Sequence, residues 1–138
     1  ISFGKPAERF KKAHWAALTI EAYILDRLEV GESFKNIFKE QREWYAEMGY
    51  PEEWKLHFQG GPTGYRVGDA TRCFTDTCVV SDQAFDWFIT VDGLQVEELS
   101  LLSEHRVEVA SLGKEWPRTQ IKCTHGTVTL PEMWVKSY

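Results

Sequence analysis

The amino-acid sequence predicts an α+β fold, in which two helices are followed by an antiparallel sheet. Apolar residues recur at three- and four-residue steps as far as about residue 48, and after residue 53 they recur at every second position in short runs. The chain has 138 residues, of which 43% are hydrophobic. This is enough to bury the core of one ordinary domain, so we expect residues 1–138 to form a single domain.

The first helix is expected over residues 6–30, because the apolar residues of this stretch fall on one side of a helix with 3.6 residues per turn. Gly31 ends this helix, and Ser33 is a suitable N-cap for a second one. Gly49 supplies the C-terminal stop of the second helix. The first third of the sequence is therefore expected to be helical.

The rest of the sequence contains short runs rich in Val, Ile, Thr, Phe and Trp, separated by Gly, Asp, Ser or Pro. Such runs are typical of strands. The Asp92-Gly93 pair between two of them indicates a tight hairpin turn, since Gly tolerates the positive φ that such turns need. The expected strands are Trp54–Phe58, Cys73–Val80, Ala84–Thr90, Gln95–Leu102, Arg106–Leu112 and Arg118–Cys123, with a last extended piece at Met133–Lys136.

The formal net charge is -5 and the basic residues are scattered, which argues against a nucleic acid or an anionic membrane as a partner. No apolar run approaches the roughly 20 residues that span a bilayer, and the chain does not start with a signal-peptide pattern. The expected location is therefore the cytoplasm. Cys73, Cys78 and Cys123 lack zinc-knuckle spacing and are expected to be reduced thiols. Cys123 and His125 form a Cys-x-His pair, which strand alternation explains as well as half a metal site does.

The most informative stretch is Lys55 to Tyr65, which reads Lys-Leu-His-Phe-Gln-Gly-Gly-Pro-Thr-Gly-Tyr. It resembles the His-His-Gln-Gly-Gly-x-x-Gly-Tyr loop of the pita-bread metallopeptidases, a family that includes aminopeptidase P, Xaa-Pro dipeptidase and creatinase. In that family the metal-binding His is followed by Gly three residues on and by His or Tyr seven residues on. Counting from Phe58 gives Gly61 and Tyr65, so the resemblance places a phenyl ring at the ligand position.

The resemblance continues towards the end of the chain. The segment Ala84–Trp87 is similar to an Ala-Phe-x-Trp-x segment of the family, in which the next ligand follows the Trp, and this position is Phe88 here. The last ligand follows a Gly-x-x-x-Glu spacing, which Gly93 and Glu97 reproduce. The two Asp ligands precede the family segment that Ile1–Gly4 resembles. The resemblance thus covers the C-terminal half of the catalytic domain, with most metal ligands lost, and implies two helices on a curved antiparallel sheet.

The resemblance assigns no catalytic residue and no metal or other cofactor. It implies a vestigial cleft. If a metal binds, its candidate ligands are His57 and Glu97 and the metal is manganese, cobalt or zinc, since a slip of one residue would return His57 to the ligand position. The cleft residues are His57, Phe58, Tyr65, Arg66, Phe88 and Glu97.

Structural explanations compete with these assignments. A turn between strands explains Gly60, Gly61 and Gly64 better than a phosphate-binding loop does, because no P-loop or dinucleotide context surrounds them. A surface ion pair accounts for Arg66 and Asp69. His14 and His105 have no partner pattern and are expected at the surface, and the core is the expected place for most of the tryptophans, Trp44, Trp54 and Trp87 among them.

Two hypotheses of different classes follow. In the first, the chain is an Xaa-Pro peptidase-like protein that has lost metal-dependent hydrolysis and acts as a binding or assembly module. A homodimer, or association with a missing peptidase half, is then expected, because loss of the first half of the domain exposes apolar surface. In the second, the chain is a fragment of an active metal-dependent Xaa-Pro dipeptidase or aminopeptidase, whose other ligands come from a missing segment or a partner chain. Binding of a proline-containing peptide in the old cleft is a third hypothesis.

Overall fold

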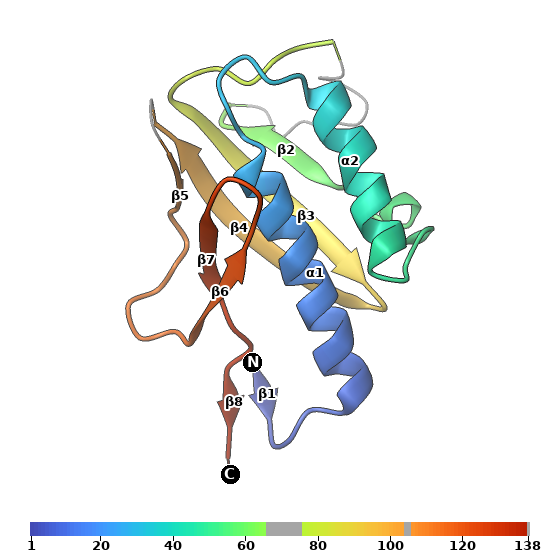
Figure 1. Ribbon diagram of the computed structural model, residues 1–138. Helices are drawn as coiled ribbons and strands as arrows, with labels where there is room; N and C mark the ends of the chain where they lie inside the picture. Colours follow the sequence, from blue (N-terminus) through green and yellow to red (C-terminus); the bar gives the residue numbers. More distant parts are fainter. Residues whose placement is uncertain (66–75, 104–105, 138) are drawn as a thin grey trace.

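Two helices lie on one face of a four-stranded antiparallel sheet (Figure 1). The computed structural model describes residues 1–65, 76–103 and 106–137. The helices are α1 (Glu8–Asp26) and α2 (Phe34–Glu47). In spatial order, the strands of the sheet are β2 (Gly60–Thr63), β3 (Gln83–Val91), β4 (Leu94–Leu102) and β5 (Val107–Val109). The predicted α+β class is confirmed.

The smaller elements lie around this layer pair. A second hairpin runs alongside α1, on the same side of the sheet as the helices (Figure 1). It consists of β6 (Arg118–Lys122) and β7 (Thr127–Pro131). Two further short strands, β1 (Ser2–Phe3) and β8 (Val135–Lys136), pair in parallel, and a single 3₁₀ turn, η1 (Glu53–Lys55), follows α2. None of the described helices is long and apolar enough to cross a membrane.

The core lies between the helices and the sheet. On β3, Phe85, Trp87 and Ile89 are fully buried, and Trp87 stacks on Phe85 with their ring centroids 6.2 Å apart. Phe38 of α2 also packs against Trp87, with ring centroids 5.9 Å apart. On the covering side of the core, α1 is lined by small and aliphatic residues, which let it approach the sheet closely. Its buried apolar residues are Ala13, Ala16, Ala17, Leu18, Ile20, Ala22, Ile24 and Leu25.

The β3–β4 hairpin forms the centre of the sheet. Asp92 and Gly93 have φ values of 48° and 77°, which is the pattern of a type I′ turn, the turn that fits the twist of two paired strands. The hairpin pairs Val91 with Leu94 and continues to Gln83 with Leu102. The turn predicted at Asp92-Gly93 and the two strands around it are therefore confirmed.

Several other predictions about single elements need correction. The two helices are confirmed, but α1 ends at Asp26 and not near residue 30. The predicted strand Trp54–Phe58 is wrong, because this stretch contains η1. Apolar and polar residues alternate here, but alternation does not supply a partner strand. The backbone carbonyls of Trp54 and His57 accept hydrogen bonds from the side chain of Gln59 instead.

The strand predicted at Cys73–Val80 is also not formed in its described part. Residues 73–75 lie outside the described residues, and residues 76–80 contain only an isolated bridge between Cys78 and Ser33. The backbone N–H of Val79 donates to the carbonyl of Glu32 at 2.8 Å. This segment therefore pairs with the connection between the helices, a contact between parts of the chain too distant in sequence for local alternation to reveal.

Three strands were missed, the two-residue β1 among them, and one is shorter than expected. The glycines predicted to form a turn lie largely within β2, where Gly60 and Gly61 pair with Trp87 and Asp86. The missed strand β7 completes the hairpin with β6. β5 ends at Val109 because the next two residues, Ala110 and Ser111, both donate their backbone N–H to the carbonyl of Leu99. This arrangement of two residues opposite one is that of a bulge, which ends regular pairing.

Candidate functional site

The two main strands place Phe88 and Glu97 side by side. The two residues are partners in the β3–β4 register. Side chains alternate between the faces of a strand, so both lie on the face opposite to the one that the helices cover, together with Asp86. On β4, the residues that alternate towards this face are exposed, namely Gln95, Glu97, Leu99 and Leu101. We call this surface the open face of the sheet.

The loop before β2 brings two more of the predicted cleft residues to Phe88. The ring of Phe58 meets the ring of Phe88 edge to face, with centroids 5.2 Å apart. The imidazole of His57 lies 6.3 Å from the same ring, between centroids, and is exposed, whereas Phe58 is half-buried. Phe58, which the resemblance compares with the metal-binding His, therefore packs against Phe88, whereas His57 stays exposed to solvent beside them.

Gly60 determines how closely the loop approaches β3. Its φ is 80°, and a Cβ atom at this position would lie 2.1 Å from the backbone oxygen of Asp86 and 2.9 Å from the Phe88 ring. Only glycine fits there, because both the backbone conformation and the space exclude a side chain. Gly60 therefore allows β2 to lie against the strand that carries Phe88.

The buried side-chain amide of Gln59 links the same loop to α2. The side chain of Gln59 is 1% exposed and accepts hydrogen bonds from Gln41 at 2.9 Å and from the hydroxyl of Tyr45 at 3.1 Å. It donates to the carbonyls of Trp54 and His57 at 3.1 and 2.9 Å. Both ends of the loop are thus tied to α2. Sequence reasoning did not single out Gln59, although it belongs to the loop motif; its role depends on contacts across the core.

The remaining cleft residues do not join this group. Tyr65 is fully exposed to solvent. Arg66 and Asp69, for which a surface ion pair was predicted, both lie outside the described residues. The structure therefore brings together His57, Phe58, Phe88 and Glu97, which together line the open face near the start of β2.

The open face carries few groups that could bind the divalent metals implied by the resemblance. A hard cation needs several carboxylate or imidazole groups around one point. The acids near Phe88 are Glu97 and Asp86. Asp86 lies diagonally opposite Glu97, because its register partner is Leu99. Burial raises the pKa of Asp86. Among the described residues no group of three or more His, Cys, Asp or Glu side chains is placed to hold a metal ion. The residues that the structure describes on this face therefore do not fit a metal pair.

A second acidic group lies on the covered face and was missed by the sequence analysis. Glu21 of α1 is completely buried, and burial raises its pKa well above the ordinary value of 4.5, as does the neighbouring charge of Glu98. Neither carboxylate oxygen of Glu21 accepts a well-formed hydrogen bond from a described residue, although the backbone of Glu98 lowers its pKa slightly. Glu98 is 9% exposed, its pKa is raised by burial, and it accepts a hydrogen bond from the Ser111 hydroxyl.

Of the other histidines, His14 and His125 each approach an acid. The Nε2 atom of His14 lies 3.3 Å from Glu132, so His14 is not the unpartnered surface residue expected, while His105 lies outside the described residues. His125 lies 3.0 Å from Asp26 through its Nδ1 atom. Cys123 is half-buried, and burial raises the pKa of its thiol to about 11. The Cys-x-His pair follows the end of β6, and its imidazole is directed to Asp26 of α1.

Comparison with solved structures places this arrangement among known folds. The chain superimposes on the X-Pro aminopeptidase from Thermotoga maritima with a TM-score of 0.67 and 23% identity, covering 83% of this chain and 35% of that one. For the Xaa-Pro dipeptidase from Bacillus anthracis the TM-score is 0.66 and the identity 22%, with 83% and 34% covered. For the dipeptidase PepE from Mycobacterium ulcerans these values are 0.61, 18%, 78% and 31%. No family model matches the sequence, and no curated protein matches it.

These similarities define the class of fold. A TM-score above 0.6 over about four-fifths of the chain shows that the two helices and the antiparallel sheet are arranged as in these peptidases. The chain therefore has the pita-bread peptidase-like fold. It spans about one third of the length of the structures that it matches.

Proposed function

We propose that this chain is an Xaa-Pro peptidase-like protein that has lost metal-dependent hydrolysis and acts as a binding or assembly module. The observation that carries the proposal is the edge-to-face contact of Phe58 and Phe88 beside Glu97. Two phenyl rings occupy the positions where the resemblance expects an imidazole and a further ligand. A phenyl ring offers no lone pair to a metal, and a single remaining carboxylate of the set does not hold a divalent pair against water.

The open face supports a role in association. Leu99 and Leu101 are 41% and 45% exposed on β4, two and four residues beyond Glu97, the register partner of Phe88. Exposed apolar side chains that lie together on one sheet face are typical of surfaces that bind another protein. We propose that the chain forms a homodimer, or associates with a peptidase half, through this face. The cytoplasm is the proposed location. The ligand proposed for the cleft is a proline-containing peptide. The aromatic side chains would hold it, and it would not be hydrolysed.

The test is to measure metal content and metal-dependent stability together. The purified chain is analysed for bound elements, melted with and without manganese, cobalt, zinc and chelator, and assayed on an Xaa-Pro dipeptide. We expect no bound metal, no shift of the melting temperature and no hydrolysis. Stoichiometric binding with a raised melting temperature, as ligand linkage requires, together with hydrolysis, would overturn the proposal.

A double substitution provides the matched positive control. Phe58→His and Phe88→Glu replace the two phenyl rings, 5.2 Å apart, by an imidazole and a carboxylate beside Glu97. Three groups that bind hard or borderline cations then lie together. We expect this variant to bind manganese or zinc at least tenfold more tightly than the natural sequence. Phe58→Leu with Phe88→Leu, at the same two positions, controls for loss of the aromatic contact without new metal ligands.

The second candidate function is that of a fragment of an active metal-dependent peptidase. Two observations favour it. The chain spans only about a third of the matched structures, and Glu97 is retained as the register partner of Phe88, whose ring lies near His57. Under this hypothesis, a separate polypeptide supplies the missing ligands and His57 moves into the ligand position. Hydrolysis that requires both chains and manganese or cobalt, and that is lost in Glu97→Ala, would support it. Hydrolysis that survives Glu97→Ala would exclude it.

A further inference from the structure

Part of β4 has a backbone edge that no described strand pairs with. The type I′ turn makes Val91 and Leu94 a hydrogen-bonded pair, so the backbone groups of Leu94, Val96 and Glu98 are directed to β3 and those of Gln95 and Glu97 point away from it. Further along, Leu99 bonds outwards, to Ala110 and to the hydroxyl of Ser111. No hydrogen bond from a described residue reaches the outward N–H and C=O groups of Gln95 and Glu97.

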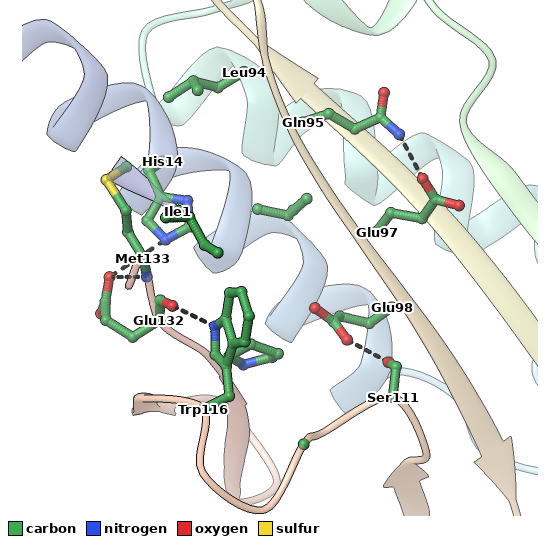
Figure 2. Close-up of a pocket in the computed structure, with 13 residues that line it drawn as sticks. Ile1, His14, Leu94, Gln95, Glu97, Glu98, Ser111, Trp116, Glu132 and Met133 are labelled. Atoms are coloured by element: carbon green, nitrogen blue, oxygen red, sulfur yellow. Dashed lines mark hydrogen bonds and ion pairs between the residues drawn. The ribbon is translucent and has the colours of Figure 1, made fainter. Parts of the chain in front are cut away.

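A groove runs along this edge. It has a volume of about 530 Å³ and contacts the five consecutive residues Leu94 to Glu98. Since neighbouring side chains of a strand point to opposite faces, a cavity that touches all five must follow the edge of the strand. Its far wall consists of Trp116, Glu132 and Met133. Figure 2 shows these residues gathered on one side of β4 with His14, while the Gln95 and Glu97 side chains lie on the other side.

Most of the charged side chains in the groove are acidic. Three glutamates line it, Glu97, Glu98 and Glu132, together with His14 and the N-terminal residue Ile1, and no described Lys or Arg does. The indole of Trp116 donates its N–H to the carbonyl of Glu132 at 2.8 Å, which holds the ring across the groove from the strand. An extended ligand therefore meets backbone donors and acceptors, an aromatic wall and negative charge at the same edge. These are the elements of recognition by strand addition, in which the backbone supplies affinity and alternate side chains supply specificity.

We propose that the edge of β4 at Gln95 and Glu97 is a docking site for an extended polypeptide strand that alternates basic and apolar side chains. A strand paired here places one side chain directly opposite Glu97, at about 5 Å between Cβ atoms, where Lys or Arg forms an ion pair. The next side chain points to the other face, towards Trp116 and Met133, and is apolar. The proposal deepens the binding role proposed above, on which it rests, by naming a surface and a class of partner.

A second copy of this chain is disfavoured as the occupant of this edge. In a symmetric pairing of two β4 edges, Glu97 of one copy would lie close to the same acids of the other, and like charges opposite each other destabilise paired strands. A basic strand avoids this cost.

The first experiment uses amide hydrogen exchange. The probe is a capped hexapeptide that alternates lysine and leucine, and its matched control alternates glutamate and leucine. In the free protein, the amides of Gln95 and Glu97 exchange fast, and those of Val96 and Glu98, which bond to β3, exchange slowly. We expect the basic peptide to slow exchange at Gln95 and Glu97 about tenfold or more, and the acidic peptide to have no effect. Equal protection by both peptides, or none with the basic peptide at millimolar concentration, would overturn the proposal.

Variants separate backbone pairing from side-chain effects. Gln95→Pro removes an outward N–H that a docked strand needs, whereas Gln95→Ala keeps it, so only the first is expected to abolish binding. Glu97→Lys is expected to exchange the preference, so that the acidic peptide binds and the basic one does not. This charge exchange remains a test even if the proline variant fails to fold. An unchanged preference in Glu97→Lys would contradict the proposal.

Two further outcomes distinguish the alternatives. Protection of Gln95 and Glu97 that grows with protein concentration in the absence of peptide would mean that a second copy occupies the edge, and the proposal would fall. The metal experiment is independent of this one. Stoichiometric metal binding with intact peptide docking would overturn the loss of hydrolysis and leave the docking edge in place, whereas failure of docking in a metal-free chain would overturn this inference alone.

Discussion

The two faces of the sheet differ in what holds their side chains. On the covered face, Phe85, Trp87 and Ile89 alternate along β3 beneath the helices and are completely buried. On the open face, Asp86 and Phe88 occupy the positions between them and are only half-buried. The same nine-residue strand thus contributes to the core with one set of residues and to the candidate site with the other. Residues of the core tolerate little change, whereas the open face has room for altered chemistry at little cost in stability.

The largest expected effect is the difference in stability between substitutions at Trp87 and Phe88, which are adjacent in β3 and lie on opposite faces of the sheet. Trp87→Ala removes a fully buried side chain that stacks on Phe85 and packs against Phe38, and should lower the free energy of unfolding by about 3–5 kcal/mol. Phe88→Ala, one residue along, is half-buried and should cost only about 1–2 kcal/mol. Urea denaturation of both variants measures the difference. Equal losses would mean that the open face is as well packed as the covered one.

The second effect tests how closely β2 approaches the sheet. Gly60 and Gly93 have similar φ values, 80° and 77°, but a Cβ at Gly60 would lie 2.1 Å from the Asp86 oxygen and one at Gly93 would meet nothing within 4 Å. Gly93→Ala should therefore cost about 1 kcal/mol, for the backbone conformation alone. Gly60→Ala should cost about 2–4 kcal/mol, because the strand must also shift. Thermal or urea unfolding provides the measurement, and similar losses would contradict the close contact.

The third effect concerns the acid buried on the covered face. The pKa of Glu21 in the folded protein is raised well above its ordinary value of 4.5, chiefly by burial. At a pH between the pKa of Glu21 in the unfolded chain and its higher pKa in the folded chain, the folded chain binds more protons. The stability that Glu21 contributes is therefore greatest below about pH 4.5 and falls as pH rises towards the folded pKa. The slope is at most about 1.4 kcal/mol per pH unit.

Glu21→Gln keeps the shape of the side chain and removes the titration. We expect this variant to unfold at a higher urea concentration than the natural sequence at pH 7. Its stability should also no longer decline between pH 4.5 and neutrality. Glu29→Gln, at an exposed position next to the end of α1, controls for removal of a carboxylate at the surface. A decline that persists unchanged in Glu21→Gln would show that another group causes it.

The smallest effect measures the aromatic contact of the open face. Edge-to-face pairs contribute about 0.5–1.5 kcal/mol beyond the area that they bury. A double-mutant cycle with Phe58→Leu and Phe88→Leu should give a coupling energy in this range. The same cycle with His57→Leu in place of Phe58→Leu should give less, because His57 is exposed and its ring lies 6.3 Å from Phe88. A larger coupling for His57 would mean that the imidazole, and not the phenyl ring, fills the site.

Much of the fold was predictable because it depends on neighbours in sequence. The 3.6-residue period of apolar side chains located α1 and α2, and the Asp92-Gly93 pair located the turn between β3 and β4. The pairing of Phe88 with Glu97 follows from that turn, since a two-residue hairpin sets the register of both strands. This part of the candidate site was therefore accessible from the sequence.

Other features were decided only by tertiary structure. Glycine has little preference for strands, so β2 forms because β3 offers it hydrogen bonds and because Gly60 fits against Asp86. The burial of Glu21 beside Glu98, the hydrogen bonds of Gln59 to α2 and the unpaired edge of β4 each depend on segments far apart in the chain. The sequence by itself determined the two helices and the tight turn between β3 and β4, through contacts between residues close together in the chain. Which side chains meet across the core, and which edge remains unpaired, was decided by packing of the whole chain, because no local pattern encodes the partner of a distant residue.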